Sequence, residues 1–214
     1  MSNAPLSRFC VLVPVKPTAL AKSRLAPLGE EARQSLVAAF AVDTVTAALA
    51  SPLVGAVLVV TDDHVLAATL GGLGAQVVPD GVTDDLNGSL LQAAAEARRR
   101  WPELAPAAVC ADLPALRTAD LTRALQAASE HGTSFVPDVN GDGTTMVVAL
   151  SADEFAPRFG AGSRDAHVSE GAHELVEIDV PTLRRDVDTP DDLRDAVRLG
   201  LGKRTAEVAA RIRL

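Results

Sequence analysis

Short runs of β-branched and other apolar residues alternate with longer amphipathic segments along almost the whole chain. This alternation is typical of strands that feed helices in an α/β sheet, and it constrains the fold more than any other feature. The apolar runs predict strands at residues 9–15, 55–61, 75–79, 106–111, 133–137, 144–150, 174–178 and 184–187. The amphipathic segments predict helices at residues 30–50, 63–71, 88–101, 118–131, 190–200 and 203–212.

The organisation of the chain favours a single domain over residues 1–214, since a chain of this length suits one α/β domain or two very small ones. No fixed-period repeat, low-complexity tract or Ser/Gly linker divides it. We expect residues 1–7 to form a flexible N-terminal arm. Residues 138–173 interrupt the alternation with a glycine-containing turn and a polar stretch, and we interpret them as an insertion or flap.

The charge balance limits the partners of the protein. The formal net charge is −8 and the pI is about 5.0, so the long-range field repels nucleic acid and anionic membranes. A small anionic ligand in a local basic pocket remains compatible with this charge. The first apolar run, residues 9–15, is too short to span a bilayer, and no small-residue cleavage pattern of a signal peptide follows it. We therefore expect a cytoplasmic protein that binds neither nucleic acid nor membrane.

Several familiar motifs are absent from the sequence. There is no P-loop, and no Ser/His/Asp arrangement stands out. Cys10 and Cys110 both lie in apolar runs, which predicts reduced, buried thiols and no disulfide framework. The histidines lack metal-ligand spacing, and we expect each of them at the surface: His64, His131, His167 and His173.

A basic segment follows the first predicted strand. Lys16, Lys22 and Arg24 place three cations within nine residues, directly after the carboxyl end of that strand. In open α/β sheets ligands bind just outside these strand ends, and such a loop could neutralise a triphosphate. A solvated basic loop without a ligand is the alternative interpretation.

Carboxylates follow two later predicted strands. Asp112 ends a buried run before Pro114, and Asp186 and Asp188 stand two residues apart, so on a strand they would face the same side. Each has a structural alternative: Asp112 as a turn former or helix cap, and the pair as partners of Arg185 or as a cap. Together the three carboxylates predict a Mg²⁺ site at the ligand-binding edge of the sheet.

Two small loops complete the set of candidate site segments. Residues 140–145 and 158–164 are rich in glycine and hydroxyl side chains, so their backbone N–H groups and hydroxyls could hold a phosphate or carboxylate. A hairpin turn and a surface loop are the structural alternatives.

Taken in order, these motifs resemble the 2-phospho-L-lactate/phosphoenolpyruvate guanylyltransferases of deazaflavin coenzyme biosynthesis. The resemblance spans roughly residues 9–200 and is carried by Pro14-Val15-Lys16, Lys22-Ser23-Arg24-Leu25-Ala26-Pro27, Asp85-Leu86-Asn87-Gly88-Ser89-Leu90, Ala111-Asp112-Leu113-Pro114, Gly143-Thr144, Arg158-Phe159-Gly160-Ala161-Gly162-Ser163 and Asp186-Val187-Asp188-Thr189-Pro190. It implies a single-domain, Rossmann-like nucleotidyltransferase of the sugar-nucleotide-transferase type, with a mixed, mostly parallel sheet flanked by helices. The chain departs from the family at Ala111, where glycine is common.

The resemblance also implies a reaction, in which GMP from GTP joins the phosphate of a three-carbon acid and pyrophosphate leaves. Residues 138–173 would form the acceptor-binding flap. Catalysis is implied for Lys22, Arg24 and Asp112. The remaining implied roles are GTP binding by Lys16, Lys22, Arg24, Asn87, Gly88 and Ser89, acceptor binding by Thr144, Gly160 and Ser163, and Mg²⁺ binding by Asp112 with Asp186 or Asp188. The family's habit favours a homodimer, which the sequence itself does not establish.

Two other functions stay open at this point. The chain could be a nucleotidyltransferase for another acceptor, such as a molybdopterin or a sugar phosphate, or a GTP-binding protein without catalytic activity. An aromatic content of 3% favours a small, polar acceptor over a larger one. Between the two three-carbon acids we favour phosphoenolpyruvate, because the segments 143–144 and 160–163 resemble actinobacterial members most.

Overall fold

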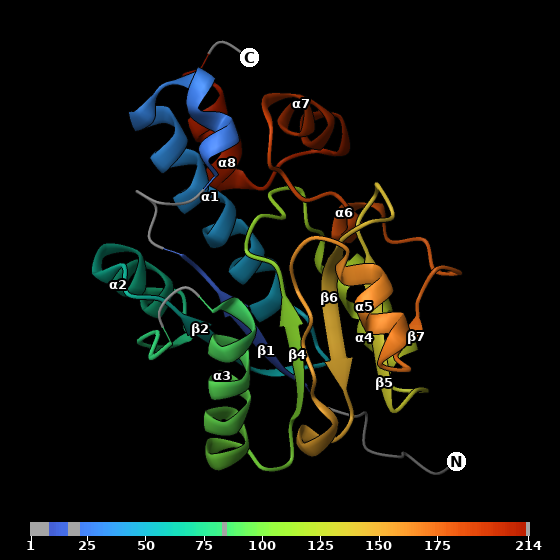
Figure 1. The fold of residues 1–214 in the computed structure, drawn as a ribbon. Helices are drawn as coiled ribbons and strands as arrows, with labels where there is room; N and C mark the ends of the chain where they lie inside the picture. Colours follow the sequence, from blue (N-terminus) through green and yellow to red (C-terminus); the bar gives the residue numbers. More distant parts are fainter. Residues whose placement is uncertain (1–8, 17–21, 83–84, 213–214) are drawn as a thin grey trace.

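A single seven-stranded sheet forms the centre of the protein, as the computed structural model in Figure 1 shows for residues 9–16, 22–82 and 85–212. The strands are β1 (Phe9–Pro14), β2 (Val54–Val60), β3 (Gln76–Val78), β4 (Ala105–Val109), β5 (Thr133–Pro137), β6 (Thr144–Ala149) and β7 (His173–Glu174). Their order is β3-β2-β1-β4-β6-β5-β7, and β6 alone among them pairs antiparallel with both of its neighbours. The sheet is therefore mixed and mostly parallel, which confirms the predicted fold class.

Helices cover both faces of this sheet. They are η1 (Ser23–Leu28), α1 (Glu30–Leu49), α2 (His64–Gly72), α3 (Leu86–Arg100), α4 (Thr118–Ala128), η2 (Ala152–Glu154), α5 (Ser163–Ser169), α6 (Pro181–Arg184), α7 (Pro190–Leu199) and α8 (Lys203–Ala209). Helices α1, α2 and α4 pack on one face, and α3 and α5 lie on the other, in front of the sheet in Figure 1. Among the helices so described, none is long and apolar enough to cross a membrane.

The central strand β1 shows why the sequence forms a buried strand. Val11 and Val13 pack into the core under α1 and α4, whereas Cys10 and Leu12 pack into the core under α3. All four are fully buried, because alternate side chains of a strand point to opposite faces and both faces are covered. Cys10 and the half-buried Cys110 are free thiols, and burial raises the pKa of Cys10 to about 12.

One predicted strand is wrong and another is shortened. Residues 181–184 form the short helix α6, and residues 185–189 form a loop, where the sequence predicted a strand at 184–187. The buried carboxylate of Asp120 accepts hydrogen bonds from the backbone N–H (3.1 Å) and the hydroxyl (2.6 Å) of Thr182, which stabilises the helical turn. Val187 is buried like a strand residue, which explains the error. Where the sequence predicted a strand at 174–178, the structure has the two-residue strand β7.

The segment 138–173 is more closely integrated than an added flap would be. It contributes β6, which lies in the middle of the sheet between β4 and β5. The turn at residues 138–143 and the stretch between β6 and β7 lie outside the sheet, and the second of these contains η2 and the unpredicted helix α5. The N-terminal arm predicted at residues 1–7 lies outside the described residues.

The C-terminal helix α8 is attached to the domain through α1. Asp43 on α1 is buried, and its carboxylate accepts hydrogen bonds from the backbone N–H groups of Arg204 (3.0 Å) and Thr205 (2.7 Å) at the start of α8. Such a carboxylate satisfies the N–H groups that the first turn of a helix leaves unpaired.

We therefore expect Asp43→Ala to lower the free energy of unfolding by about 1–2 kcal/mol, the range found for lost helix caps. For a chain of this size each kcal/mol corresponds to about 2–4 °C in Tm. Thermal unfolding followed by circular dichroism measures the change. The control is Glu207→Ala, which removes an exposed ion pair with Arg204 on the same helix. Equal Tm values for the two variants would contradict the role of Asp43.

Candidate active site

The strand order places a crevice at the carboxyl ends of β1 and β4. From β1 the chain builds β2 and β3 on one side, and it then returns through α3 to place β4 on the other side. Ligands of open α/β sheets bind where the strand order reverses in this way. Because β1 and β4 are parallel neighbours, the segments 14–16 and 110–112 emerge at the same edge.

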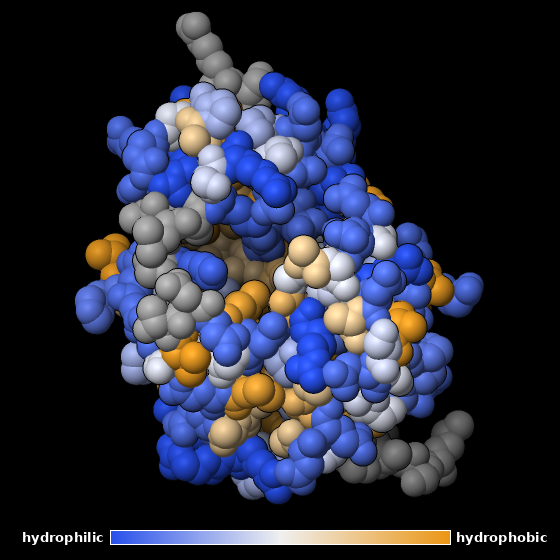
Figure 2. All heavy atoms as spheres, in the orientation of Figure 1, coloured by the Kyte–Doolittle hydropathy of each residue, from blue (hydrophilic) through white to orange (hydrophobic). Residues whose placement is uncertain are grey.

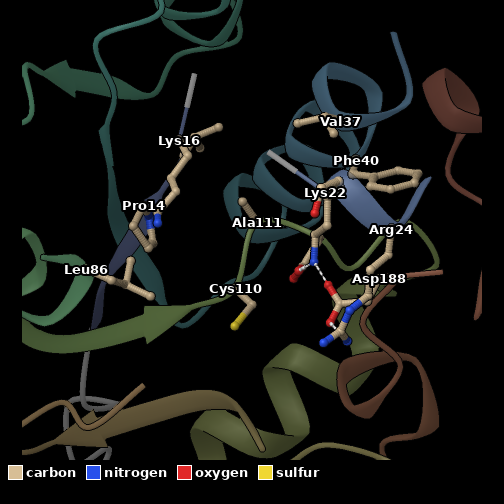
Figure 3. Close-up of a pocket in the computed structure, with 13 residues that line it drawn as sticks. Pro14, Lys16, Lys22, Arg24, Val37, Phe40, Leu86, Cys110, Ala111 and Asp188 are labelled. Atoms are coloured by element: carbon tan, nitrogen blue, oxygen red, sulfur yellow. Dashed lines mark hydrogen bonds and ion pairs between the residues drawn. The ribbon is translucent and has the colours of Figure 1, made fainter. Parts of the chain in front are cut away.

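A cavity of about 430 Å³ occupies this crevice and appears as the hollow near the centre of Figure 2. Lys16 lies on one wall, and Lys22 and Arg24 lie opposite it, as Figure 3 shows. Apolar side chains, including those of Leu86 and Val37, form much of the remaining surface. The cavity therefore combines apolar walls with three cations, an arrangement suited to a flat, polyanionic ligand. Its lining is Pro14, Val15, Lys16, Lys22, Ser23, Arg24, Val37, Phe40, Leu86, Cys110, Ala111, Asp112 and Asp188.

Lys22 forms the electrostatic centre of the cavity. Its ammonium makes ion pairs with the carboxylates of both Asp112 and Asp188, drawn as dashed lines in Figure 3. Burial disfavours the charged ammonium, but the two carboxylates outweigh this effect, so the pKa of Lys22 is raised above its ordinary value. The Lys22 backbone has φ 56° and ψ 52°, a left-handed conformation that costs free energy for a residue other than glycine.

Two of the three predicted carboxylates, Asp112 and Asp188, line this cavity, and Asp186 lies near them, although the strand expected to carry Asp186 and Asp188 is a loop. Asp112 follows β4, and Asp186 and Asp188 lie between α6 and α7. Burial, reinforced by the carboxylates of Asp112 and Asp188, raises the pKa of Asp186 from 3.8 to about 7. Three acidic side chains thus lie at the ligand-binding edge of the sheet. The single positive charge of Lys22 is smaller than the negative charge that they can carry together.

The structural alternatives for these carboxylates do not account for them. Arg185 turns to Asp192 (3.3 Å) and Asp195 (3.4 Å) on α7. The cap of α7 is the side chain of Thr189, in a reciprocal capping box with Asp192. Asp112 is also not the cap of any helix among the described residues. Its buried Oδ1 has no hydrogen-bond partner within the described ranges. A buried, unsatisfied carboxylate oxygen points to a missing partner.

The carboxylates fit a divalent cation that a ligand helps to hold. Within residues 9–16, 22–82 and 85–212, no three Asp, Glu, His or Cys side chains are placed to hold a metal ion by themselves. Mg²⁺, however, commonly binds one or two carboxylates and completes its shell with substrate phosphates and water. Asp112 and Asp188 already share one cation, the Lys22 ammonium, and Oδ1 of Asp112 has no partner in the described part of the chain. These two residues could therefore hold Mg²⁺ together with a bound phosphate group.

The residues predicted to lie by a nucleoside are engaged in other contacts at the start of α3. The side-chain amide of Asn87 pairs with the backbone of Phe159, accepting from its N–H (2.8 Å) and donating to its carbonyl (3.0 Å). The backbone N–H of Gly88 donates to Asp85, and the buried Ser89 hydroxyl donates to Asp80 at 2.6 Å. Their neighbour Leu86 lines the cavity, and contact of the three residues themselves with a nucleoside stays a prediction.

The predicted acceptor-binding residues lie around a histidine that sequence reasoning missed. Thr144 begins β6 beside Cys110, and its hydroxyl lies 3.1 Å from Nδ1 of His167. Gly160 and Ser163 are joined by a hydrogen bond, and Ser163 opens α5, the helix that carries His167. The expected surface position of His167 is wrong, since the residue is 1% exposed. The one feature of the sequence that could have indicated this position is its spacing: His167 follows Ser163 by four residues, which places both on one face of α5, a helix that was not predicted.

The comparisons with known proteins agree with this geometry. A family described as "Guanylyl transferase CofC like" matches residues 9–214. The phosphoenolpyruvate guanylyltransferase of Thermomonospora curvata is 50% identical over 204 residues, which make up 95% of this chain and 90% of that protein. The phosphoenolpyruvate guanylyltransferase of Streptomyces coelicolor is 48% identical over 206 residues, or 96% and 97% of the two chains.

A solved structure supports the fold independently. A protein of Desulfovibrio desulfuricans assigned as a nucleotide-diphospho-sugar transferase superposes with a TM-score of 0.71 at 16% identity, over 94% of each chain. The expected nucleotidyltransferase fold and the resemblance drawn from the motifs are both confirmed. A family match over nearly the whole chain, with relatives of about half identical sequence, leads to one conclusion: the protein belongs to the CofC-like guanylyltransferase family.

Proposed function

We propose that the protein transfers GMP from GTP to the phosphate of phosphoenolpyruvate and releases pyrophosphate, as a cytoplasmic step of deazaflavin coenzyme biosynthesis. The observation that carries this proposal is the cavity at the strand reversal, where three cations and a carboxylate pair surround one chamber. Relatives of about half identical sequence carry the name of this activity.

The cavity suggests how GTP would bind. Lys16 on one wall, and Lys22 with Arg24 on the other, would hold the phosphates. Arg24 is exposed, and its guanidinium lies 3.9 Å from Asp188, so it is free to turn towards a phosphate. The apolar surface formed by Leu86 and Val37 would face the base. Charge neutralisation and positioning, which nucleotidyl transfer needs most, are thus supplied by side chains already in place.

Asp112 and Asp188 would hold Mg²⁺, which would neutralise negative charge on the triphosphate when bound. In the free protein Lys22 screens the repulsion between these two carboxylates. On GTP binding, the Lys22 ammonium would contribute its charge to the phosphates. Burial, and after it the neighbouring carboxylates, raises the pKa of Asp186, so added positive charge at the site would favour its ionised form.

The acceptor would bind at residues 158–163 and Thr144. The backbone N–H groups of Gly160, Ala161 and Gly162 have no partner in the part of the chain that the structure describes, so they can donate to a carboxylate. The acceptor phosphate is already an anionic nucleophile and needs no general base. In keeping with this, the described lining of the cavity includes no histidine.

The reaction is tested by pyrophosphate release from GTP and Mg²⁺, with phosphoenolpyruvate, 2-phospho-L-lactate, a sugar phosphate or no acceptor. We expect release that depends on phosphoenolpyruvate. Release with 2-phospho-L-lactate alone would change the acceptor, and release only with the sugar phosphate would favour the alternative nucleotidyltransferase. GTP binding without release in any reaction would indicate a silent nucleotide-binding protein.

Asp112→Asn tests the carboxylate site. The substitution keeps the shape of the side chain and removes the charge that would hold Mg²⁺, so we expect kcat/KM to fall by about 100-fold or more. Pyrophosphate release measures the loss, and circular dichroism shows that the fold persists. Asp191→Asn is the matched control, because that aspartate is exposed on α7. Activity of Asp112→Asn equal to that of the control would refute the metal-binding role.

The raised pKa of Asp186 predicts a pH-dependent stability. Between pH 4 and pH 7 the folded protein holds a proton that the unfolded chain has released, so stability falls as the pH rises through this window. Asp186→Asn imitates the protonated form. In buffer without divalent metal, it should raise Tm above that of the wild type by about 2–4 °C or more at pH 8, and by nothing at pH 4. Equal shifts at both pH values would contradict this assignment.

A further inference from the structure

Two side chains from different helices hold adjacent residues of one loop, residues 158–163, which we call the acceptor loop. The backbone N–H of Arg158 donates to Nε2 of His167 on α5 at 3.0 Å. The next residue, Phe159, makes both of its backbone hydrogen bonds with the amide of Asn87 on α3, at 2.8 and 3.0 Å. Three hydrogen bonds over two consecutive residues fix the backbone more firmly than loop contacts with solvent would.

The contacts of His167 determine which of its nitrogens carries the proton. Because Nε2 accepts a hydrogen bond from the Arg158 backbone, it is unprotonated, and the proton of the neutral ring lies on Nδ1. The protonated Nδ1 therefore faces two oxygen acceptors, the hydroxyl of Thr144 at 3.1 Å and the backbone carbonyl of Ser163. Because a protonated Nδ1 cannot accept, the Thr144 hydroxyl keeps its own proton, which it could donate to the acceptor.

Packing restricts the ring of His167 to this orientation. It stacks on Phe135 with 5.3 Å between the ring centroids, and it meets the edge of Phe159 at 5.9 Å. The residue is 1% exposed, and burial lowers its pKa below the ordinary value, which keeps the ring neutral. The side chain of Arg158 adds an ion pair with Glu170, the residue directly after α5, at 2.6 Å, so the start of the loop is held both by α5 and by its C-terminal cap.

The restrained pair stands directly before Gly160, Ala161 and Gly162, whose backbone N–H groups have no partner among the described residues. Gly160 has φ +137° and Gly162 has φ +66°, conformations that favour glycine and turn the chain sharply. The direction of the following N–H groups depends on where Arg158 and Phe159 are held, since each peptide plane fixes the start of the next.

We propose that His167 and Asn87 are positioning residues of the acceptor site, which hold the acceptor loop and the Thr144 hydroxyl in the orientation that binds the acceptor. Neither residue touches the acceptor. This inference rests on the proposed function for the identity of the acceptor. It predicts that loss of either anchor raises KM for the acceptor, and that loss of His167, which has no predicted contact with GTP, leaves KM for GTP unchanged.

A pair of substitutions separates the two bonds of His167. In His167→Gln the side-chain oxygen reaches the place of Nε2 and can still accept from Arg158. In His167→Asn the amide reaches only the place of Nδ1, so it keeps the contact with Thr144 and loses the loop. We expect His167→Asn to raise KM for phosphoenolpyruvate about tenfold, the effect of one lost hydrogen bond, and His167→Gln to change it by less than about threefold. Both should keep KM for GTP within about twofold.

Asn87→Ala is the second variant, because it removes the other anchor without touching the buried ring. It should also raise KM for phosphoenolpyruvate, and its effect should be less than additive with that of His167→Asn, since both act on one loop. Gln92→Ala, an exposed position on α3, is the matched control. Equal damage by Gln and Asn at position 167, or a rise in KM for GTP in the His167 variants, would overturn the proposal.

Hydrogen exchange of the peptide that contains Arg158 and Phe159 provides a readout independent of the reaction. Exchange should be faster in His167→Asn and Asn87→Ala than in the wild type, and unchanged in His167→Gln. Wild-type exchange in all variants would show that these side chains do not hold the loop. If the wild type releases pyrophosphate with no acceptor, the proposed function fails, while the exchange measurement still decides whether the anchors exist.

Discussion

The ion pairs of Lys22 with Asp112 and Asp188 are the contact on which the site depends. They join three segments far apart in the sequence: the basic segment after β1, the end of β4, and the loop before α7. Without this ammonium, two partly buried carboxylates would face each other, and their repulsion would oppose the packing of α7 against the rest of the domain. The pocket for a polyanion is thus held together in the free protein by the same kind of charge that its ligand requires.

The carboxylates of the site carry more negative charge than Lys22 neutralises. This excess indicates what the site is for. One lysine stands among three aspartates. Burial together with the neighbouring carboxylates raises the pKa of Asp186, and Oδ1 of Asp112 has no hydrogen-bond partner among the described residues. A site built only for stability would pair or remove such groups, because buried unpaired polar groups lower the free energy of unfolding. Their persistence is what distinguishes a ligand site from a structural ion pair.

Much of this arrangement follows from local sequence patterns. The buried run of β1 followed by Lys16, and the run of β4 followed by Asp112, place both residues at the ligand-binding edge through strand polarity alone. The same reasoning predicted a strand at residues 184–187, which is wrong. Leu183 and Val187 are buried, as strand residues would be, but they lie in α6 and in a loop. His167 could not be predicted at all, since its role comes from contacts with β6 and the acceptor loop, which no local pattern encodes.

The reversed direction of β6 has a consequence for where the two proposed substrate sites lie. The carboxyl end of β4 emerges at the ligand-binding edge, and an antiparallel neighbour begins at that same edge, so Cys110 lies against Thr144 and Thr145. A parallel strand of the same six residues would have carried Thr144 to the opposite edge, about 17 Å away. A single inverted strand thus lets the tip of a β-hairpin face the loops that follow the parallel strands, and it makes room for a two-substrate reaction on one side of a small domain.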